Sequence, residues 1–458
     1  MRRAVLFLAV ACMHLAAQPP SPGKLVTLNI AATNSRDEPV ADLQLSDLQL
    51  REEGKPQPIV FFHYAGSSHS AAAPSPGEFD NHPVAAPIVI LLDRWNERLV
   101  MSGRSEIELA TAIQHLETAG NVYVYFLTNK GELVPLQSAP NPSPAELRAA
   151  LERGIEENQG FRVRDDLNVR IQKTFGALNL LRLRMDAMAG RKSLIWITQG
   201  IPLTFRVPGG AMIDLTPDVR KLSELEAQSQ IAMYTVDQTN GVGTDLSRTL
   251  QLFSALTGGR WSSHDNPAVA LSDALTDARG NYRIAYYSTA AEKEGKETKI
   301  RVDTTRKGVH LLTREGFTAE PGGPNPQQQE AARFENEIRS PVEASEIALR
   351  VAMARKPQTG AVHFDIHVDP AGVLIQPDGD HYRAELDVLA ALYSEASLKT
   401  SPATRVNLTL TKAQLDQASR AGISVPLDVP VTDQVQKLRV IVLDPKLQAL
   451  GSVTIPTK

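Results

Sequence analysis

The stretch Pro87–Asp93 (PIVILLD) decides the fold, because an unbroken apolar run ends there at a carboxylate. Such runs are typical of strands that are buried on both faces, as in a parallel sheet. Similar runs follow at Val122–Leu127, Leu194–Thr198 and Ile231–Val236, and helical patterns lie between them. This alternation predicts βαβ units, and therefore a doubly wound, mostly parallel α/β sheet over residues 87–318.

The residues on both sides of this region have a different pattern. Short alternating strands separated by turns occupy residues 24–64 and predict a small N-terminal β domain. Short strands return from residue 342, and they predict an antiparallel β-sandwich over residues 342–458. Residues 65–86 and 319–341 are rich in Pro and polar residues, so we interpret them as linkers.

Length and composition agree with several globular domains. The chain has 458 residues, and at about 150 residues per domain this indicates about three domains. It carries 48 basic and 52 acidic side chains, for a formal net charge of -4. A protein that binds nucleic acid needs a surplus of Lys and Arg on one face, so we expect no nucleic-acid partner. The composition also excludes a disulfide scaffold, a collagen, a coiled coil and a multi-span membrane protein.

The first 17 residues are typical of a secretory signal peptide. Arg2 and Arg3 precede the apolar run Ala4–Met13, and Leu15–Ala17 offers small residues for cleavage. The run is too short to span a bilayer, which takes about 20 apolar residues, and no later segment qualifies. We therefore expect an exported protein that is periplasmic, in the outer envelope or extracellular. Cys12, the single cysteine, would leave with the signal peptide unless it is the site of lipidation.

Several ordered stretches together resemble the von Willebrand factor A-type domain, in the VWFA-related version of Acidobacteria. They are Asp93 at the end of its strand, Gly190–Gly200 (GRKSLIWITQG), Ile231–Asp237 (IAMYTVD), Thr257–Arg260 (TGGR), Asn281–Ser288 (NYRIAYYS) and Arg314–Phe317 (REGF). The flanking β regions also resemble those of this family, so the resemblance covers most of the chain after the signal peptide.

The resemblance implies a metal-dependent binding site at the carboxyl ends of the strands, where open α/β sheets bind ligands. The family motif is Asp-x-Ser-x-Ser, whose oxygen atoms suit a hard cation. The corresponding residues 93–97 (DRWNE) keep Asp93, but Trp95 and Glu97 stand in place of the two serines. A later family Asp corresponds to Gln199. We therefore expect a degenerate site that binds no metal, with Asp93 and Glu97 as the candidate ligands of Mg²⁺, Mn²⁺ or Ca²⁺ otherwise.

Other patterns give no predicted catalytic or cofactor-binding residue. His363, Asp365, His367 and Asp369 share one face of a predicted strand, which fits either a metal pair or a solvated face. The sequence contains neither a Gly-x-Ser-x-Gly elbow nor a His-Glu-x-x-His motif.

We therefore expect a non-enzymatic, exported protein-binding or adhesion-type module whose partner is a protein of the envelope or the extracellular space. Arg94, Trp95, Glu97 and Gln199 are the candidate partner-binding residues, since an exposed Trp beside Arg is typical of interface anchors. The alternatives are a metal-dependent adhesion protein with variant ligands and an envelope hydrolase.

Overall fold

The computed structural model describes most of the chain after the predicted signal peptide. The described residues are 23–66, 74–81, 85–97, 104–115, 121–136, 143–157, 166–207, 209–239, 245–263, 266–288, 290, 295–318, 325–355, 361–395, 397–431 and 434–457. The predicted signal peptide and Cys12 lie outside them. No helix among these residues is long and apolar enough to cross a membrane.

The predicted fold class, a doubly wound and mostly parallel α/β sheet with flanking β units, is wrong. Strands make up 41% and helices 31% of the structure, and the strands are spread over several sheets. Only four of the strand pairs among the described residues are parallel, and the others are antiparallel. The reason is that apolar runs report burial on both faces, which antiparallel strands under a covering layer also have.

The parallel pairs lie in one six-stranded sheet. Its order is β13 (Trp261–Ser262), β12 (Ile231–Asp237), β9 (Lys192–Thr198), β6 (Ile88–Asp93), β7 (Val122–Leu127) and β8 (Leu133–Pro135). Only β8 is antiparallel to its neighbour. Since every residue of β6, β9 and β12 is buried, these strands form the centre of this part of the molecule.

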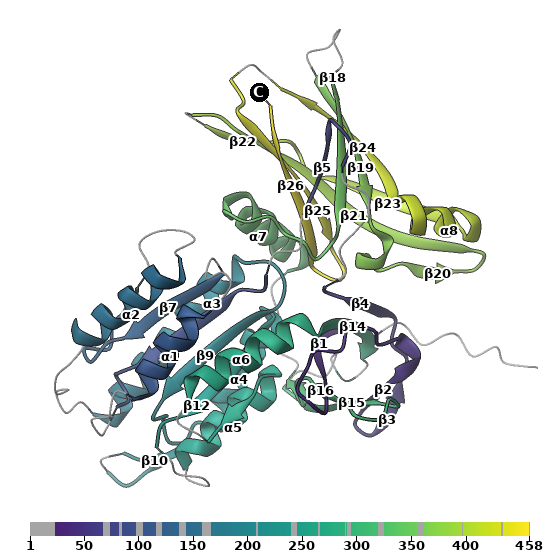
Figure 1. Ribbon diagram of the computed structural model, residues 1–458. Helices are drawn as coiled ribbons and strands as arrows, with labels where there is room; N and C mark the ends of the chain where they lie inside the picture. The colour runs from purple at the N-terminus through teal and green to yellow at the C-terminus, as the bar shows by residue number, and fades with distance from the viewer. Residues whose placement is uncertain are drawn as a thin grey trace, which may run out of the picture.

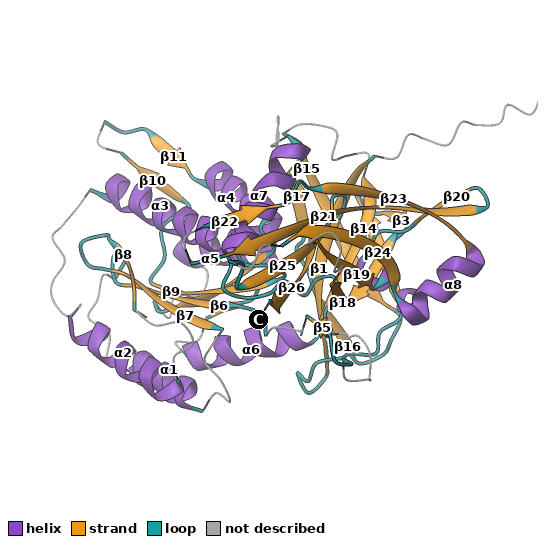
Figure 2. Ribbon diagram, turned by 90° about the horizontal axis from the view of Figure 1, so that it is seen from above, coloured by secondary structure: helices purple, strands orange, loops and turns teal. Residues whose placement is uncertain are grey.

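Helices cover both faces of this sheet (Figure 2). One layer contains α1 (Arg104–Gln114), α2 (Pro144–Glu157) and α6 (Pro267–Arg279). The other contains α3 (Leu167–Asp186), α4 (Thr216–Gln228) and α5 (Asp245–Thr257). A short hairpin, β10 (Thr204–Arg206) and β11 (Met212–Asp214), follows β9.

A second unit lies beside the parallel sheet (Figure 1). Its strands come from the parts of the chain that precede and follow the parallel sheet in the sequence. One sheet has the order β16 (Val309–Leu312), β1 (Lys24–Asn34), β14 (Asn281–Ser288) and β4 (Phe61–Tyr64). The other has the order β17 (Gly316–Thr318), β15 (Glu297–Thr304), β2 (Leu48–Glu52) and β3 (Lys55–Gln57). The predicted N-terminal β domain is therefore completed by β14 to β17, which lie within the range predicted for the α/β domain.

The C-terminal unit has two antiparallel sheets that enclose one apolar core. The first has the order β24 (Ile423–Pro430), β19 (Ala361–Val368), β18 (Leu349–Arg355) and β5 (Glu78–Asp80). In the second, β21 (His381–Tyr393) pairs with β20 (Gln376–Asp378), β22 (Leu398–Thr400), β23 (Thr404–Thr411) and β25 (Lys437–Asp444), and β25 pairs with β26 (Ala449–Pro456). Helix α7 (Pro326–Arg339) precedes β18 in the chain, and α8 (Lys412–Ala421) links β23 to β24.

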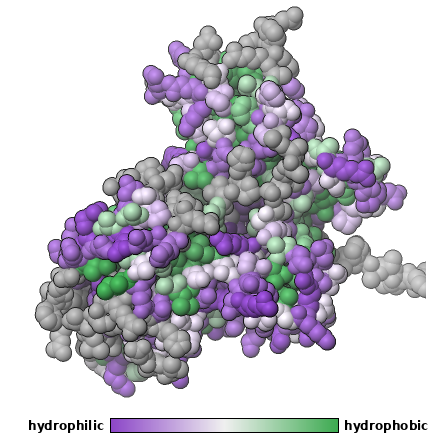
Figure 3. Space-filling view, viewed as in Figure 1, coloured by the Kyte–Doolittle hydropathy of each residue, from purple (hydrophilic) through white to green (hydrophobic). Residues whose placement is uncertain are grey.

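Both predicted linkers contain regular structure. Strand β5 lies within residues 65–86 and α7 lies within residues 319–341. An ion pair between Asp80 and Arg350 (2.7 Å) holds β5 against β18. In space filling, the described residues on the viewed face are mostly hydrophilic, with separate hydrophobic patches (Figure 3).

Candidate functional site

Asp93 ends β6 at the carboxyl edge of the parallel sheet, where it is buried and fully hydrogen-bonded. Its Oδ1 accepts a bond from the main-chain N–H of Asn96 (3.0 Å). Its Oδ2 accepts bonds from Asn96 Nδ2 (2.7 Å), Trp196 Nε1 (3.1 Å) and Thr198 Oγ1 (2.7 Å). These four hydrogen bonds, three of them to Oδ2, tie the carboxylate to the surrounding protein. Burial raises the pKa of Asp93, although the hydrogen bonds act in the opposite direction.

Asn96 fastens the loop after β6 to helix α3. Its Nδ2 also donates to Thr174 Oγ1 (2.8 Å), and its Oδ1 accepts a bond from Arg170 Nη2 (3.2 Å). The side chain is completely buried, and both of its N–H groups and its oxygen atom are hydrogen-bonded within the protein. Asn96 thus joins Asp93 to α3 in one network.

Trp95 lies in the core, where only 1% of its surface is exposed. Its Nε1 donates to the main-chain oxygen of Arg170 (3.1 Å), and Lys173 Nζ lies 4.6 Å from its ring centre. A buried Trp cannot reach a partner surface without local unfolding. The expectation that Trp95 anchors an interface therefore loses its basis.

The other candidate residues at this edge are also ion-paired or buried. Arg94 Nη1 contacts both carboxylate oxygens of Glu97, at 3.0 and 3.1 Å. Gln199 is buried, with 2% of its surface exposed. Glu97 is thus paired with Arg94, and the carboxylate of Asp93 accepts four hydrogen bonds from the protein. The prediction that no metal binds here stays a prediction.

The carboxyl edge has a second buried carboxylate that we did not select from the sequence. Asp237, at the end of β12, accepts bonds from the Thr239 main-chain N–H (2.8 Å), Thr239 Oγ1 (2.6 Å) and Ser247 Oγ (2.6 Å). A carboxylate directly after a buried strand was the available signal, as at Asp93. Both carboxylates therefore fasten loops at this edge.

The His/Asp strand in the C-terminal unit forms surface ion pairs. His363 Nδ1 lies 2.8 Å from Asp428 Oδ1, and His367 Nε2 lies 3.4 Å from Asp365 Oδ2. Within the described part of the chain, no group of three or more His, Cys, Asp or Glu residues could hold a metal ion.

A large cleft lies at the opposite, amino end of the parallel strands. Its volume is about 1340 Å³. One side is formed by residues 85–87, 121, 187–191 and 230, which immediately precede the strands of the sheet. The second β unit and the C-terminal unit form the other sides, so three parts of the molecule meet around this cleft.

The cleft lining is strongly basic although the whole chain is slightly acidic. Among the described residues, seven Arg or Lys side chains line it: Arg184, Arg191, Arg279, Arg283, Arg339, Lys437 and Arg439. Two acidic residues of the described chain line it, and both are hydrogen-bonded or ion-paired within the protein. Glu343 Oε1 accepts a bond from the Thr454 main-chain N–H (2.6 Å), and Glu346 Oε1 lies 2.8 Å from Arg283 Nη1.

Two of the lining arginines are buried and incompletely hydrogen-bonded. Arg191 and Arg283 are only 6% and 7% exposed. Arg191 Nη1 and Arg283 Nε have no hydrogen-bond partner among the described residues, and neither has Oδ1 of buried Asn281, which also lines the cleft. Buried polar atoms of native proteins are nearly always paired, so these three atoms are exceptions in the wall of the cleft.

Several charged groups lie behind the cleft wall. Although burial alone would raise it, the pKa of Glu346 is lowered by Arg283 and Arg333, which lie close by. Burial, followed by the repulsion from Arg333, lowers the pKa of Lys192 to about 7. Asp186 also lies close to Lys192, so groups of both signs are present behind the wall.

Comparison with known proteins gives only weak similarities. No model of a protein family matches the sequence, and no curated protein matches it significantly. A pilus adhesin from Lactobacillus rhamnosus GG is 10% identical with a TM-score of 0.29; the match covers 92% of this chain and 58% of the adhesin. A von Willebrand factor type A protein from Catenulispora acidiphila is 11% identical with a TM-score of 0.27, over 66% of this chain and 81% of that protein. The chain is therefore weakly similar to an adhesin and to a von Willebrand factor A protein, and these two matches do not support the resemblance to the version of Acidobacteria.

Proposed function

We propose that this chain is an exported, non-enzymatic protein that binds a protein partner in the cell envelope or the extracellular space, and that the cleft is its binding site. The cleft volume of about 1340 Å³ carries the proposal. Pockets for small molecules measure about 300–1,000 Å³, so the cleft has room for a larger ligand such as a polypeptide segment. Ligands also commonly bind where parts of a protein meet.

The carboxyl edge of the parallel sheet is a weaker candidate for this function. Metal-bridged binding there requires free carboxylate oxygens, and those of Asp93 accept four bonds from the protein. Binding by an aromatic anchor requires an exposed Trp, and Trp95 is buried. We therefore place partner binding at the cleft and propose that it needs no cation.

The acidic residues Glu343 and Glu346 at the cleft are hydrogen-bonded or ion-paired within the protein, and this supports a binding function over a hydrolytic one. A general base needs a free carboxylate within reach of the proton that it accepts. Glu346 contacts Arg283, and Gln230 donates to it (2.9 Å). Glu343 accepts a main-chain bond from Thr454. The two acids that line the cleft therefore stabilise its wall.

Affinity capture tests the proposal. The mature chain is immobilised and exposed to envelope extract, beside a cleft variant (Arg279→Glu with Lys437→Glu) and an edge variant (Arg94→Ala with Glu97→Ala). We expect a specific protein to be retained by the wild type and the edge variant, with or without chelator, and to be lost with the cleft variant. Equal capture by all three chains, or capture that chelator abolishes, would contradict the proposal.

A further inference from the structure

We propose that the cleft binds an acidic peptide segment, that is, a stretch of a partner protein rich in Asp and Glu. This inference rests on the proposed function and specifies the chemistry of the partner. It follows from the contrast between the basic lining of the cleft and the formal net charge of -4 of the whole chain. Among the described residues, seven of the 48 basic side chains and two of the 52 acidic side chains line the cleft, so its lining has the opposite charge balance to the whole chain.

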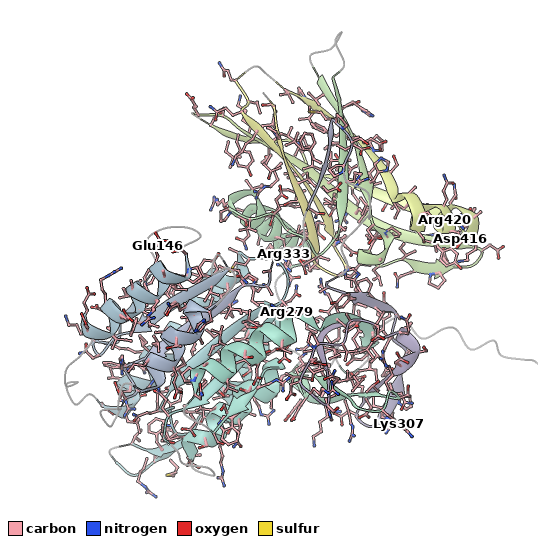
Figure 4. The ribbon with its side chains drawn as sticks, viewed as in Figure 1. Glu146, Arg279, Lys307, Arg333, Asp416 and Arg420 are labelled. Atoms are coloured by element: carbon pink, nitrogen blue, oxygen red, sulfur yellow. The ribbon has the colours of Figure 1, made fainter. Side chains whose placement is uncertain are left out.

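Exposed basic residues surround the cleft. Arg279 is exposed at the end of α6 (Figure 4), and Arg184 is exposed near the end of α3. Lys437 is exposed at the start of β25, where its Nζ lies 4.8 Å from the Tyr393 ring centre. Among the described residues none of the three has a carboxylate partner within salt-bridge distance. Unpaired cations of this kind attract an acidic ligand over several ångströms and raise its association rate.

Carboxylates are the anionic groups that suit these exposed cations. Arg donates strong, charge-assisted hydrogen bonds to carboxylate oxygens, and Arg184 and Arg279 are both exposed at the cleft. A segment rich in Asp and Glu supplies several carboxylates along one chain, so it can reach more than one of these cations.

The apolar part of the lining also suits a peptide. Phe61, Met188, Leu275 and Val342 line the same cleft as the arginines. Apolar side chains of a bound segment would bury surface against them, at about 25 cal/mol per Å². The mixture of apolar and basic groups therefore favours a segment in which acidic and apolar residues both occur.

Fluorescence anisotropy tests the inference with the full mature chain. The probe is a fluorescein-labelled peptide of Glu and Leu residues, and the comparison is the same peptide with Gln in place of Glu. We expect the Glu peptide to bind at least about tenfold more tightly than the Gln peptide, and added salt to weaken its binding. The cleft variant (Arg279→Glu with Lys437→Glu) should weaken binding by at least about tenfold.

Lys307→Glu with Arg420→Glu is the matched control, because it makes the same charge change at exposed residues away from the cleft (Figure 4). It should change the affinity by less than about twofold. Equal binding of the Glu and Gln peptides would overturn the inference, as would equal weakening by the cleft and control variants. Stronger binding of a single-stranded oligonucleotide than of the Glu peptide would also overturn it.

The two proposals fail in distinguishable ways. If the Glu peptide does not bind but envelope capture still depends on Arg279 and Lys437, the acidic chemistry is wrong and the cleft remains a protein-binding site. If capture does not depend on these residues, the proposed function itself is wrong. Circular dichroism of each variant shows whether it folds, and the exposure of the substituted residues favours normal folding.

Discussion

Substitution of Asp93 tests most directly whether the hydrogen bonds at the carboxyl edge of the parallel sheet stabilise the fold. In Asp93→Asn the remaining oxygen can take the place of Oδ2, which accepts three of the four bonds. The new amide nitrogen then faces the main-chain N–H of Asn96, which is left without an acceptor. A buried unsatisfied donor costs about 1–3 kcal/mol, so we expect a loss of stability of that size.

Asp93→Ala should cost more, because no acceptor remains. The Thr198 hydroxyl can turn away and Asn96 Nδ2 keeps its bond to Thr174, but two fixed N–H groups cannot reorient. These are the Asn96 main chain and Trp196 Nε1. Two such donors cost about 2–6 kcal/mol together.

Urea unfolding followed by Trp fluorescence measures these losses. The chain has three Trp residues, Trp95, Trp196 and Trp261, and all of them lie in or beside the parallel sheet. Asp416→Ala is the control, since it removes an exposed carboxylate paired with Lys412 and should change stability by less than about 1 kcal/mol. The reasoning is refuted if both Asp93 variants unfold at the wild-type urea concentration, or if Mg²⁺ stabilises the wild type and neither variant.

Three further predictions concern other buried groups. Trp95→Ala should destabilise the protein by about 3–5 kcal/mol in urea, because it empties a core position. Burial raises the pKa of Glu226 to about 8, so the folded state binds more protons than the unfolded state between pH 4.5 and 8. The contribution of Glu226 to the stability of the folded state therefore declines as pH rises through this window, and it lowers the melting temperature of the wild type accordingly. Glu226→Gln should remove this decline. Parallel curves of melting temperature against pH for the two proteins would show that Glu226 does not titrate there. Asp277 accepts bonds from Arg260 Nε (2.9 Å), Arg260 Nη2 (2.7 Å) and Tyr234 (2.8 Å). Asp277→Ala should cost about 3–5 kcal/mol, and the second change Arg260→Met should restore part of it; full stability of the single variant would contradict this assignment.

The positions of the central strands could be predicted from the sequence, but their partners could not. The runs at Pro87–Asp93 and Ile231–Val236 are strands β6 and β12. Asn281–Ser288 has the same buried character, yet it pairs antiparallel with β1 and β4. Hydrophobicity reports burial on two faces and carries no information about strand direction, so this strand was assigned to the wrong sheet.

Regular structure inside the predicted linkers was missed for local reasons. Strand β5 is short and polar, and pairing with β18 together with Asp80 holds it in place. Helix α7 begins after the cap residue Asn325 and has Pro326 in its first turn. That pair is a recognised start signal, but the surrounding Pro and Gln residues made the segment resemble a linker.

The candidate site was only partly readable from the sequence. Asp93 at a strand end could be recognised, but the burial of Trp95 depends on α3, which is distant in sequence. The cleft depends on residues near positions 63, 190, 280, 340 and 440, which come together only in the folded chain. Single basic residues scattered over such distances leave no motif, so a positive cleft on an acidic chain was not foreseeable.

Hydrogen–deuterium exchange with the Glu/Leu peptide tests most directly the claim that the cleft, and not the carboxyl edge, binds the partner. The account predicts slower exchange at residues 187–191 and 341–346 on peptide addition, with no change at residues 198–205. Protection at residues 198–205 with none at the cleft segments would contradict it.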